Sequence, residues 1–243
     1  MLIREWDMNT CPNNTVLVTG VSRGIGKATA NYLAGKGYHV IGVARTDPGD
    51  FPGTFRQIDL NDVSAKEVFA SIAEEFSPTR LVLNAGYVDA KLFEDMDDEG
   101  FEQTIRVNLQ SQIWAMQALI PAMKKHSFGR VVLIGSRASL GKVGRASYSA
   151  SKAALSGLAR TSALELGPHG ITVNVISPGP FETEMFATLQ PEGSKAREQL
   201  LSKIPVGRVG DPDEMAATID FFISEKAGFM TGQNLFVCGG ASL

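Results

Sequence analysis

The feature that most limits the possible folds of this chain is its regular alternation of short apolar runs with longer amphipathic segments. The apolar runs are rich in Val, Ile and Leu without strict alternation, which is typical of strands buried on both faces. These candidate strands are residues 15–20, 39–45, 54–60, 80–86, 129–136, 171–177 and 234–240. Helical patterns lie between them, at residues 24–36, 62–76, 101–125, 147–167 and 211–225. This alternation predicts an α/β fold: a doubly wound parallel sheet of about seven strands with helices on both faces.

The domain organisation follows from length and composition. A chain of 243 residues with 44% hydrophobic content can form one large core, so we expect a single domain over residues 1–243. One stretch, residues 178–210, is rich in Pro and Gly and only partly helical. A long insertion of this kind in a compact domain is usually functional, so we expect a lid over the substrate at about residues 178–210. Its apolar side chains are Phe181, Met185, Phe186 and Leu189.

Composition argues against several classes of protein. The net charge is −3 and the basic residues are scattered, so we expect no nucleic-acid partner. Cys11 and Cys238 have no metal-ligand spacing and the three histidines are isolated, so we expect no metal. The first residues include Glu5 and Asp7 and lack an apolar secretory run. No stretch approaches the roughly 20 apolar residues of a membrane span. We therefore expect a soluble, cytoplasmic protein with no membrane partner.

A glycine-rich turn follows the first candidate strand directly. Glycine permits a tight turn and lets backbone N–H groups approach a pyrophosphate, while the next helix adds the positive end of its dipole. The spacing is T-G-x-x-x-G-x-G and not the usual dinucleotide G-x-G-x-x-G. The turn predicts a nucleotide-binding loop made of Gly20, Ser22, Arg23, Gly24, Ile25 and Gly26.

The stretch "GRASYSASKAAL" places Tyr148 and Lys152 four residues apart among small residues. On a helix the two side chains face the same side. Lowering a phenol pKa from about 10 by about 3 units takes roughly 4 kcal/mol. An ammonium about 4 Å away supplies around that amount at an effective dielectric of ~20. The stretch fits either a phenol tuned by a cation or a Tyr and a Lys on a solvated helix.

The order of motifs along nearly the whole chain resembles the short-chain dehydrogenase/reductase family. The glycine loop is followed by N-A-G after the fourth candidate strand, Y-x-x-x-K, and P-G after the sixth. The resemblance implies a Rossmann-type fold and hydride transfer between a nicotinamide cofactor and a ketone or secondary alcohol. The cofactor-binding residues that it implies outside the glycine loop are Asp59, Leu60, Asn84, Ala85, Gly86, Tyr148, Lys152, Pro178, Gly179 and Thr183.

The resemblance also implies a catalytic set. Tyr148 is the general acid in reduction and the general base in oxidation, and Lys152 lowers its pKa and holds the nicotinamide ribose. Ser136 hydrogen-bonds the substrate carbonyl, where charge develops as hydride arrives. Ser139 is the alternative if the register differs. Asn108 helps to hold a proton-relay water.

The end of the second candidate strand bears on cofactor choice. NAD-preferring members of the family usually carry an acid where this chain has Ala44, and Arg45 follows it. Arginine can bind a 2′-phosphate bidentately, and Arg23 is a second candidate for that contact. Asp47 could instead reach a ribose hydroxyl. We predict that NADP(H) is preferred and keep NAD(H) as the alternative.

Within the family, the sequence is most similar to 3-oxoacyl-acyl-carrier-protein reductases, through "ITVNVISPGPFETEM" and "IPVGRVGDPDEMA". Ser127 and His169 stand where such reductases commonly carry arginine, and a candidate basic docking surface remains at Lys124, Lys125 and Arg130. Three functions stay open. The first is an NADPH-dependent ketoreductase, acting on a 3-oxoacyl thioester or a similar ketone. The second is an oxidative alcohol, polyol or sugar dehydrogenase, and the third a non-catalytic nucleotide-binding regulator.

Two positions depart from the family pattern. Arg137, directly after the proposed catalytic serine, would pair with a substrate carboxylate or phosphate if it points into the pocket. If it points away, it is a surface or interface charge. Cys238 replaces an acid common in the family's terminal motif, and we have no physical account of this change.

Two candidate helices, residues 101–125 and 147–167, carry apolar side chains on more than one face. These side chains include Ile113, Trp114, Leu119, Leu158 and Leu164. A helix that is apolar beyond one stripe must bury the excess. In the family these helices form a dimer contact, so we expect a homotetramer.

Overall fold

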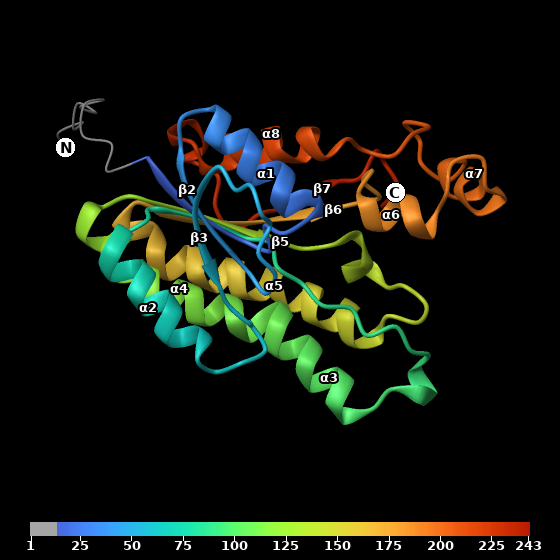
Figure 1. Cartoon of the computed structure of the whole chain (residues 1–243), viewed down its shortest axis with the longest axis horizontal. Helices are drawn as coiled ribbons and strands as arrows, with labels where there is room; N and C mark the ends of the chain where they lie inside the picture. Colours follow the sequence, from blue (N-terminus) through green and yellow to red (C-terminus); the bar gives the residue numbers. More distant parts are fainter. Residues whose placement is uncertain (1–13) are drawn as a thin grey trace.

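The computed structural model describes residues 14–243, apart from the Met185 side chain, and Glu5, Asp7 and Cys11 lie outside the described residues. One β-sheet lies between two layers of helices (Figure 1). The strands are β1 (Thr15–Thr19), β2 (His39–Ala44), β3 (Gly53–Gln57), β4 (Arg80–Leu83), β5 (Gly129–Ile134), β6 (Ile171–Pro178) and β7 (Asn234–Val237). The α-helices are α1 (Gly24–Gly35), α2 (Ala65–Phe76), α3 (Asp98–Ile105), α4 (Ser111–His126), α5 (Ala146–Leu166), α6 (Glu184–Leu189), α7 (Lys195–Leu201) and α8 (Pro212–Ile223).

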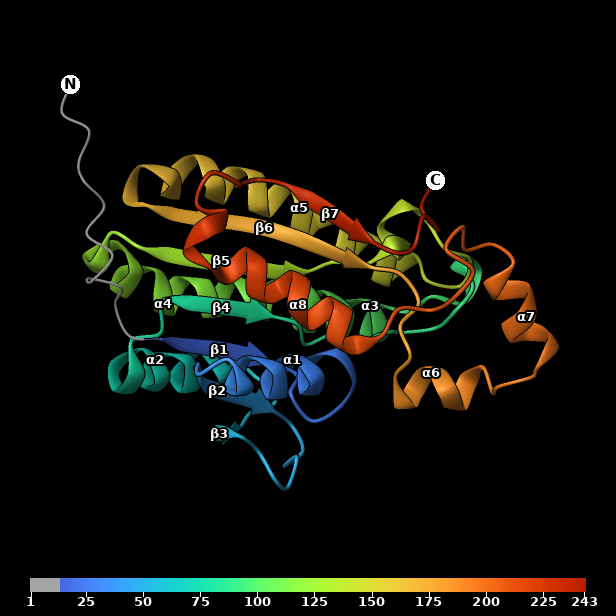
Figure 2. The ribbon, with the colours of Figure 1, turned by 90° about the horizontal axis from the view of Figure 1, so that it is seen from above.

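The sheet confirms the predicted fold class. Its seven strands, all parallel, run in the order β3-β2-β1-β4-β5-β6-β7 (Figure 2). The order reverses between β1 and β4, and ligands of doubly wound sheets bind at such a reversal, beyond the carboxyl ends of the strands. We call the side where the strands end the carboxyl edge, and the opposite side the amino edge.

Two apolar cores explain why the strand sequences are continuous apolar runs. Helices α1 and α8 cover one face of the sheet, and α2, α4 and α5 cover the other (Figure 1). Along β1, Val16 and Val18 belong to the core between the sheet and helices α1 and α8. Leu17 belongs to the core between the sheet and helices α2, α4 and α5. A strand buried on both faces has no position for a solvent-exposed polar side chain.

The helix expected at residues 101–125 is the clearest departure from the sequence-based prediction. It starts earlier, at α3, where the Asp97 side chain accepts a hydrogen bond from the Gly100 amide at 2.8 Å. A π-helical turn, Arg106–Gln110, then separates α3 from α4. The expectation of one regular helix is therefore wrong. Such π turns are rare and often occur at functional sites.

The irregular segment 178–210 lies beyond the carboxyl edge and contains α6 and α7 (Figure 2). Its two ends are joined, because the Glu182 amide donates to the Gly210 carbonyl at 2.8 Å and the Gly210 amide donates to the Pro180 carbonyl at 3.0 Å. Inside the segment, Arg197 pairs with Glu182 and donates to the Gln190 carbonyl at 3.1 Å. The segment is thus a closed loop attached at its base.

Within the described part of the chain, none of the helices combines the length and the apolar character that crossing a bilayer requires.

Candidate active site

The glycine loop has the geometry of an anion cradle. Gly20 and Gly24 adopt positive φ angles of 75° and 58°, which residues with side chains rarely adopt. A Cβ on Gly26 would lie 2.2 Å from the Gly20 carbonyl oxygen, so only glycine lets the loop close. Helix α1 follows directly, and no side chain caps its first turn. Its leading N–H groups are therefore available to a ligand.

The N-A-G stretch is attached to the end of β1. The Thr19 hydroxyl accepts hydrogen bonds from the backbone amides of Asn84 and Ala85, both at 2.9 Å, and Asn84 Nδ2 donates to the Thr19 carbonyl at 3.0 Å. Sequence reasoning missed Thr19, although a hydroxyl on the last residue of β1 was a usable signal. These bonds fix the two strand ends that flank the reversal point.

The third residue of this stretch reaches the predicted catalytic group. A Cβ built on Gly86 would lie 3.6 Å from Lys152 Nζ and 3.5 Å from Asn108 Oδ1. The end of β4, the π-helical turn and α5 therefore converge on one point.

Lys152 is fully buried where the end of β4, the π-helical turn and α5 converge. Its Nζ donates to the Ile134 carbonyl at 2.6 Å and lies 5.8 Å from the centroid of the Tyr148 ring. Burial lowers the pKa of Lys152 to about 8. The alternative of a Tyr and a Lys on a solvated helix is therefore wrong.

Tyr148 has an environment that differs from the one expected. Burial raises the pKa of its phenol, while a hydrogen bond with Ser136 and the charge of Arg145 oppose that rise. Lys152 is not among the groups that act on this pKa. Burial is the largest of these effects, so the phenol pKa is raised in the chain by itself. The role of Lys152 in lowering that pKa stays a prediction.

Ser136 is the serine that accompanies the phenol. It lies two residues beyond the end of β5 and caps the short 3-10 turn Arg137–Leu140, accepting from the Ala138 amide at 3.1 Å. The Ser136 side chain also lowers the pKa of Tyr148, whereas the Ser139 amide donates to the Ser136 carbonyl at 3.0 Å. The geometry therefore favours Ser136 over Ser139 as the partner of the phenol.

Asn108 is a buried connector within the π-helical turn. Its Oδ1 accepts from the Tyr87 amide at 2.7 Å, and its Nδ2 donates to the Tyr87 carbonyl and to Ser151 Oγ, both at 2.9 Å. Ser151 Oγ in turn donates to the Tyr148 carbonyl at 2.8 Å. Asn108 thus links the strand-end loop to the helix that carries Tyr148. Its role in holding a relay water stays a prediction.

The residues expected at the adenosine end of the cofactor lie along the same edge. Arg45 is exposed directly after β2. The Asp47 carboxylate accepts from the Gly49 amide at 2.8 Å, and Asp59 does the same for the Asn61 amide at 2.9 Å. Leu60 is buried, so the structure directs it into the core.

The residues expected after β6 lie on the side of the site opposite to the adenosine end. Thr183 caps α6 by accepting from the Phe186 amide at 3.2 Å, and a Cβ on Gly24 would lie 3.5 Å from its methyl group. Gly179 packs so closely on Cys238 that a Cβ would lie 2.7 Å from the Cys238 Cα. Pro178 ends β6. The segment after β6 therefore reaches the glycine loop.

The structure places two basic residues on which the docking and pocket hypotheses depended. Arg130 is 2% exposed, with its guanidinium donating to the carbonyls of Gly129, Gly170 and Ser224, so it cannot belong to a basic docking surface. Arg137 Nη1 donates to the Ala241 carbonyl at 2.8 Å. That bond fixes one end of its guanidinium on the C-terminal segment.

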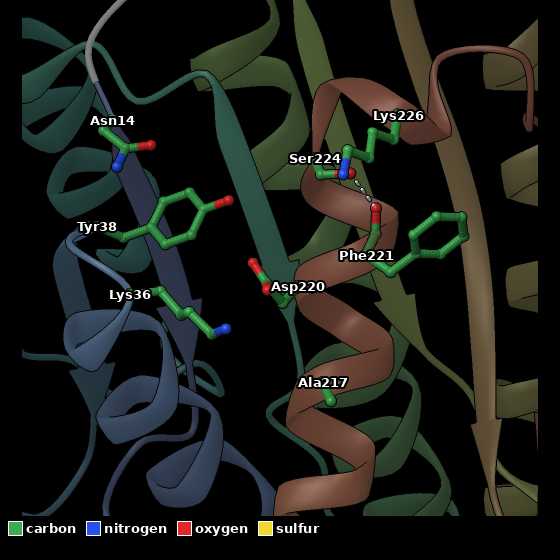
Figure 3. Close-up of a pocket in the computed structure, with 8 residues that line it drawn as sticks. All are labelled: Asn14, Lys36, Tyr38, Ala217, Asp220, Phe221, Ser224 and Lys226. Carbon is green, nitrogen blue, oxygen red and sulfur yellow. Dashed lines mark hydrogen bonds between the residues drawn. The ribbon is translucent and has the colours of Figure 1, made fainter.

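One surface hollow lies away from these residues. It measures about 410 Å³ and lies at the amino edge, between α8 and the start of β1 (Figure 3). Its lining includes Lys36, Tyr38 and Asp220, and none of the predicted site residues. A second hollow, of about 180 Å³, lies beneath segment 178–210 and includes Phe181 and Cys238. Within residues 14–243, no group of His, Cys, Asp and Glu could hold a metal ion.

These features together define a nicotinamide-dependent oxidoreductase: Ser136, Tyr148, the buried Lys152 and the glycine loop. Residues 20–242 match the family model described as enoyl-(acyl carrier protein) reductase. The chain belongs to the short-chain dehydrogenase/reductase family, and it is an NAD(P)-dependent enzyme that acts on CH–OH groups. The glycine cradle and the uncapped start of α1 fit such a cofactor.

Known proteins resemble the chain over nearly its whole length. The 3-oxoacyl-[acyl-carrier-protein] reductase of Escherichia coli (strain K12) is 38% identical, covering 92% of this chain and 95% of its own. A 3-oxoacyl (acyl-carrier-protein) reductase structure from Agrobacterium tumefaciens C58, with NADP bound, is 29% identical with a TM-score of 0.87, covering 93% of each chain. A 4-hydroxyisoleucine dehydrogenase complexed with NADH is 30% identical with a TM-score of 0.86, covering 94% of this chain and 98% of its own.

Proposed function

We propose that the chain is an NADPH-dependent ketoreductase in which Tyr148 protonates the carbonyl oxygen of a ketone. The observation that carries the proposal is the buried Lys152, whose Nζ lies 5.8 Å from the centroid of the Tyr148 ring, on the phenol that the Ser136 side chain also influences. The bound cofactor would supply the hydride. The raised pKa of Tyr148 keeps its phenol protonated near pH 7, the form that a general acid requires. Ser136 would donate to the same oxygen as negative charge develops there.

The preference for NADP(H) rests on Arg45. This arginine is exposed at the end of β2, and within the described residues it forms no ion pair. The rival ligand Asp47 already caps its own turn through the Gly49 amide. Arg45 has no ion-pair partner among the described residues, and the Asp47 carboxylate already accepts a hydrogen bond. Both features favour a cofactor that carries a 2′-phosphate. NAD(H) remains the alternative.

A small-molecule ketone is the substrate that we propose, with a 3-oxoacyl thioester among those to be tested. The 38% identity to the Escherichia coli reductase supports a 3-oxoacyl group. A carrier protein has less support, because Arg130 is buried and Ser127 and His169 supply no guanidinium. We further propose that residues 1–243 act as one catalytic domain and that segment 178–210 is its lid.

The oxidative direction is a second candidate function. The likeness to 4-hydroxyisoleucine dehydrogenase, at a TM-score of 0.86, favours oxidation of a secondary alcohol on the same residues. In that direction Tyr148 would have to ionise, which its raised pKa disfavours in the chain by itself.

We also propose a homotetramer. Trp114 and Leu119 lend it no support, because both are buried in the core beneath the sheet. Leu164 on α5 is 80% exposed and Leu235 on β7 is 42% exposed, and both are large apolar side chains. Apolar side chains exposed on an outer helix and on the edge strand suit contacts between copies of the chain. Sedimentation that shows a monomer at micromolar concentration would contradict this.

The test of the proposed function is a cofactor titration followed by a substrate panel. NADPH and NADH fluorescence titrations measure the affinity for each cofactor. Absorbance of the reduced cofactor then measures turnover with ketones and, from NADP⁺ or NAD⁺, with secondary alcohols. A ketoreductase oxidises NADPH with at least one ketone, an oxidative dehydrogenase acts only on alcohols, and a regulator binds cofactor without turnover.

A further inference from the structure

Three basic residues lie beside the catalytic hydroxyls. Arg137 follows Ser136 directly, and Lys142 and Arg145 lie on the loop that leads into α5. Arg145 is the residue before the helix and precedes Tyr148 by three positions. The Gly144 backbone of this loop packs near the Lys91 carbonyl, 3.8 Å from a built Cβ. The loop therefore leads directly into the helix that carries Tyr148.

The 3-10 turn that begins at Arg137 packs against α5, and Arg145 is the residue before that helix, so the three side chains lie near the start of α5. Partial burial lowers the pKa of Lys142, and the charges of Arg145 and Arg137 lower it further. Arg145 also acts on Tyr148, whose phenol hydrogen-bonds Ser136. The charges therefore share one small region with the hydroxyls that a substrate carbonyl would meet.

No carboxylate within residues 14–243 forms an ion pair with any of the three. Arg145 Nη1 donates to the Gly144 carbonyl at 2.9 Å, and Arg137 Nη1 is occupied by the Ala241 carbonyl. Lys142 reaches solvent. Asp89 and Asp97, which flank the Lys91 carbonyl near Gly144, are already paired with the Lys91 ammonium.

Clustered like charges disfavour one another, so the arrangement gains from an anion placed among them. Leu140 and Val143 are exposed beside the charges, at 61% and 87%, and offer apolar contact to a carbon skeleton. An anion attached to a small organic molecule matches both features.

Resting on the proposed function, we propose that Lys142 and Arg145 bind an oxyanion carried by the substrate, so that this enzyme prefers ketones bearing a carboxylate or a phosphate. Arg137 adds charge, but the Ala241 carbonyl keeps it from serving as the main ligand. The guanidinium of Arg145 and the ammonium of Lys142 hold the anion while Ser136 and Tyr148 meet the carbonyl oxygen. Sequence reasoning had considered only Arg137 for this role.

The first arm of the test measures turnover with matched pairs. The acids are 2-oxo, 4-oxo and 5-oxo acids and the neutral partners are their methyl esters; dihydroxyacetone phosphate is paired with dihydroxyacetone. Arg145→Met and Lys142→Met should each raise KM for the anionic member roughly 10- to 100-fold. KM for the neutral member should not change, because only binding to the anion is lost. The acid and phosphate pairs show separately which oxyanion is used.

Controls separate this role from a structural one. Lys125→Met removes an exposed charge at the amino edge and should leave every KM unchanged. Arg145→Lys should recover part of the affinity for the anion. Because Lys142 is exposed, its variant should fold even if the Arg145 variant does not. A parent with equal KM for anionic and neutral members, or variants that lose both equally, would overturn the proposal.

The second arm needs no turnover. Succinate and inorganic phosphate should raise the Tm of the parent, since a ligand stabilises the state that it binds. They should not raise the Tm of the double variant of Lys142 and Arg145. If no ketone or alcohol is turned over, the proposed function fails, and this arm still decides the anion site. Stabilisation that persists in the double variant would overturn it.

Discussion

Cationic side chains have different partners at the two edges of the sheet. At the amino edge, Arg80 and Arg130 are paired across β4 and β5, and both lie over the Phe128 ring, at 4.9 and 4.4 Å from its centroid. Their Nε atoms donate to the carbonyls of Ile223 and Ser224, at the end of α8. Carbonyls at a helix C-terminus carry partial negative charge, so these cations are satisfied without facing solvent.

At the carboxyl edge, the charges remain available. Lys152 is buried with one carbonyl partner, and Lys142 and Arg145 have no carboxylate among the described residues. The same residue types therefore stabilise the fold at one edge and lack carboxylate partners among the described residues at the other. The comparison teaches that burial alone does not separate structural from functional cations. The identity of the partners does.

The largest expected effect is on turnover, at the carboxyl edge. Tyr148→Phe keeps the ring and removes the hydroxyl, so it should lower turnover by about 10²- to 10⁴-fold, the usual contribution of general acid catalysis. Tm and NADPH affinity should stay close to those of the parent. Steady-state kinetics, thermal unfolding and fluorescence titration measure the three quantities. Near-normal turnover in a folded variant would show that the phenol is not the acid.

The buried lysine gives a pH dependence of stability. Its pKa is about 8 in the folded chain and near 10.5 when unfolded, so between these values the unfolded state binds more protons. The free energy of unfolding should therefore rise with pH from about 8 upward, by on the order of 3 kcal/mol in total. Below about pH 8 both states are protonated and this dependence vanishes.

The measurement is Tm between pH 7.5 and 9.5 for the parent and Lys152→Met, which lacks the titrating group. The upper limit avoids ionisation of Tyr148, whose raised folded pKa makes stability fall once unfolded tyrosine loses its proton. The parent curve should rise relative to that of the variant. Parallel curves would mean that folding does not lower the pKa of Lys152.

At the amino edge, the expected effect is on stability instead. Arg130→Met removes the guanidinium donor of the Gly170 and Ser224 carbonyls and leaves each with a long backbone bond of 3.4 Å. A hydrogen bond to a charged group is worth about 1.5–3 kcal/mol. For a chain of this size, each kcal/mol lowers Tm by roughly 2–4 °C. Thermal unfolding should show this loss, while KM for ketone and NADPH should not change. Arg145→Met is the matched variant at the other edge and should leave Tm almost unchanged.

The smallest expected effect separates the two cofactors. Arg45→Ala should weaken NADPH binding about 10- to 100-fold, as expected for a lost charge-assisted contact to phosphate. NADH affinity should not change, because NADH lacks that phosphate. Fluorescence titration of both cofactors measures the difference. An equal loss for both would show that Arg45 does not read the phosphate.

Periodicity predicted the fold because strands buried on both faces and amphipathic helices leave distinct patterns. The sheet, the glycine turn and the N-A-G stretch therefore followed from local sequence. The π-helical turn at Arg106–Gln110 did not, because the same side chains fit an α-helix. The burial of Arg130 and the raised pKa of Tyr148 could not be predicted either, since both depend on neighbours distant in sequence. Lys142 and Arg145 were missed because an exposed loop charge has no local signature.

The π-helical turn also has an arithmetic consequence. It holds one residue more than the same length of α-helix, and one residue corresponds to about 100° of rotation about the helix axis. Deleting a single residue there would restore a regular helix, yet it would rotate either α3 or α4 against the rest of the fold. Asn108 would then no longer meet both Tyr87 and Ser151. The extra residue therefore sets the rotation between α3 and α4. A regular helix would form without it, but the geometry around Tyr148 depends on it.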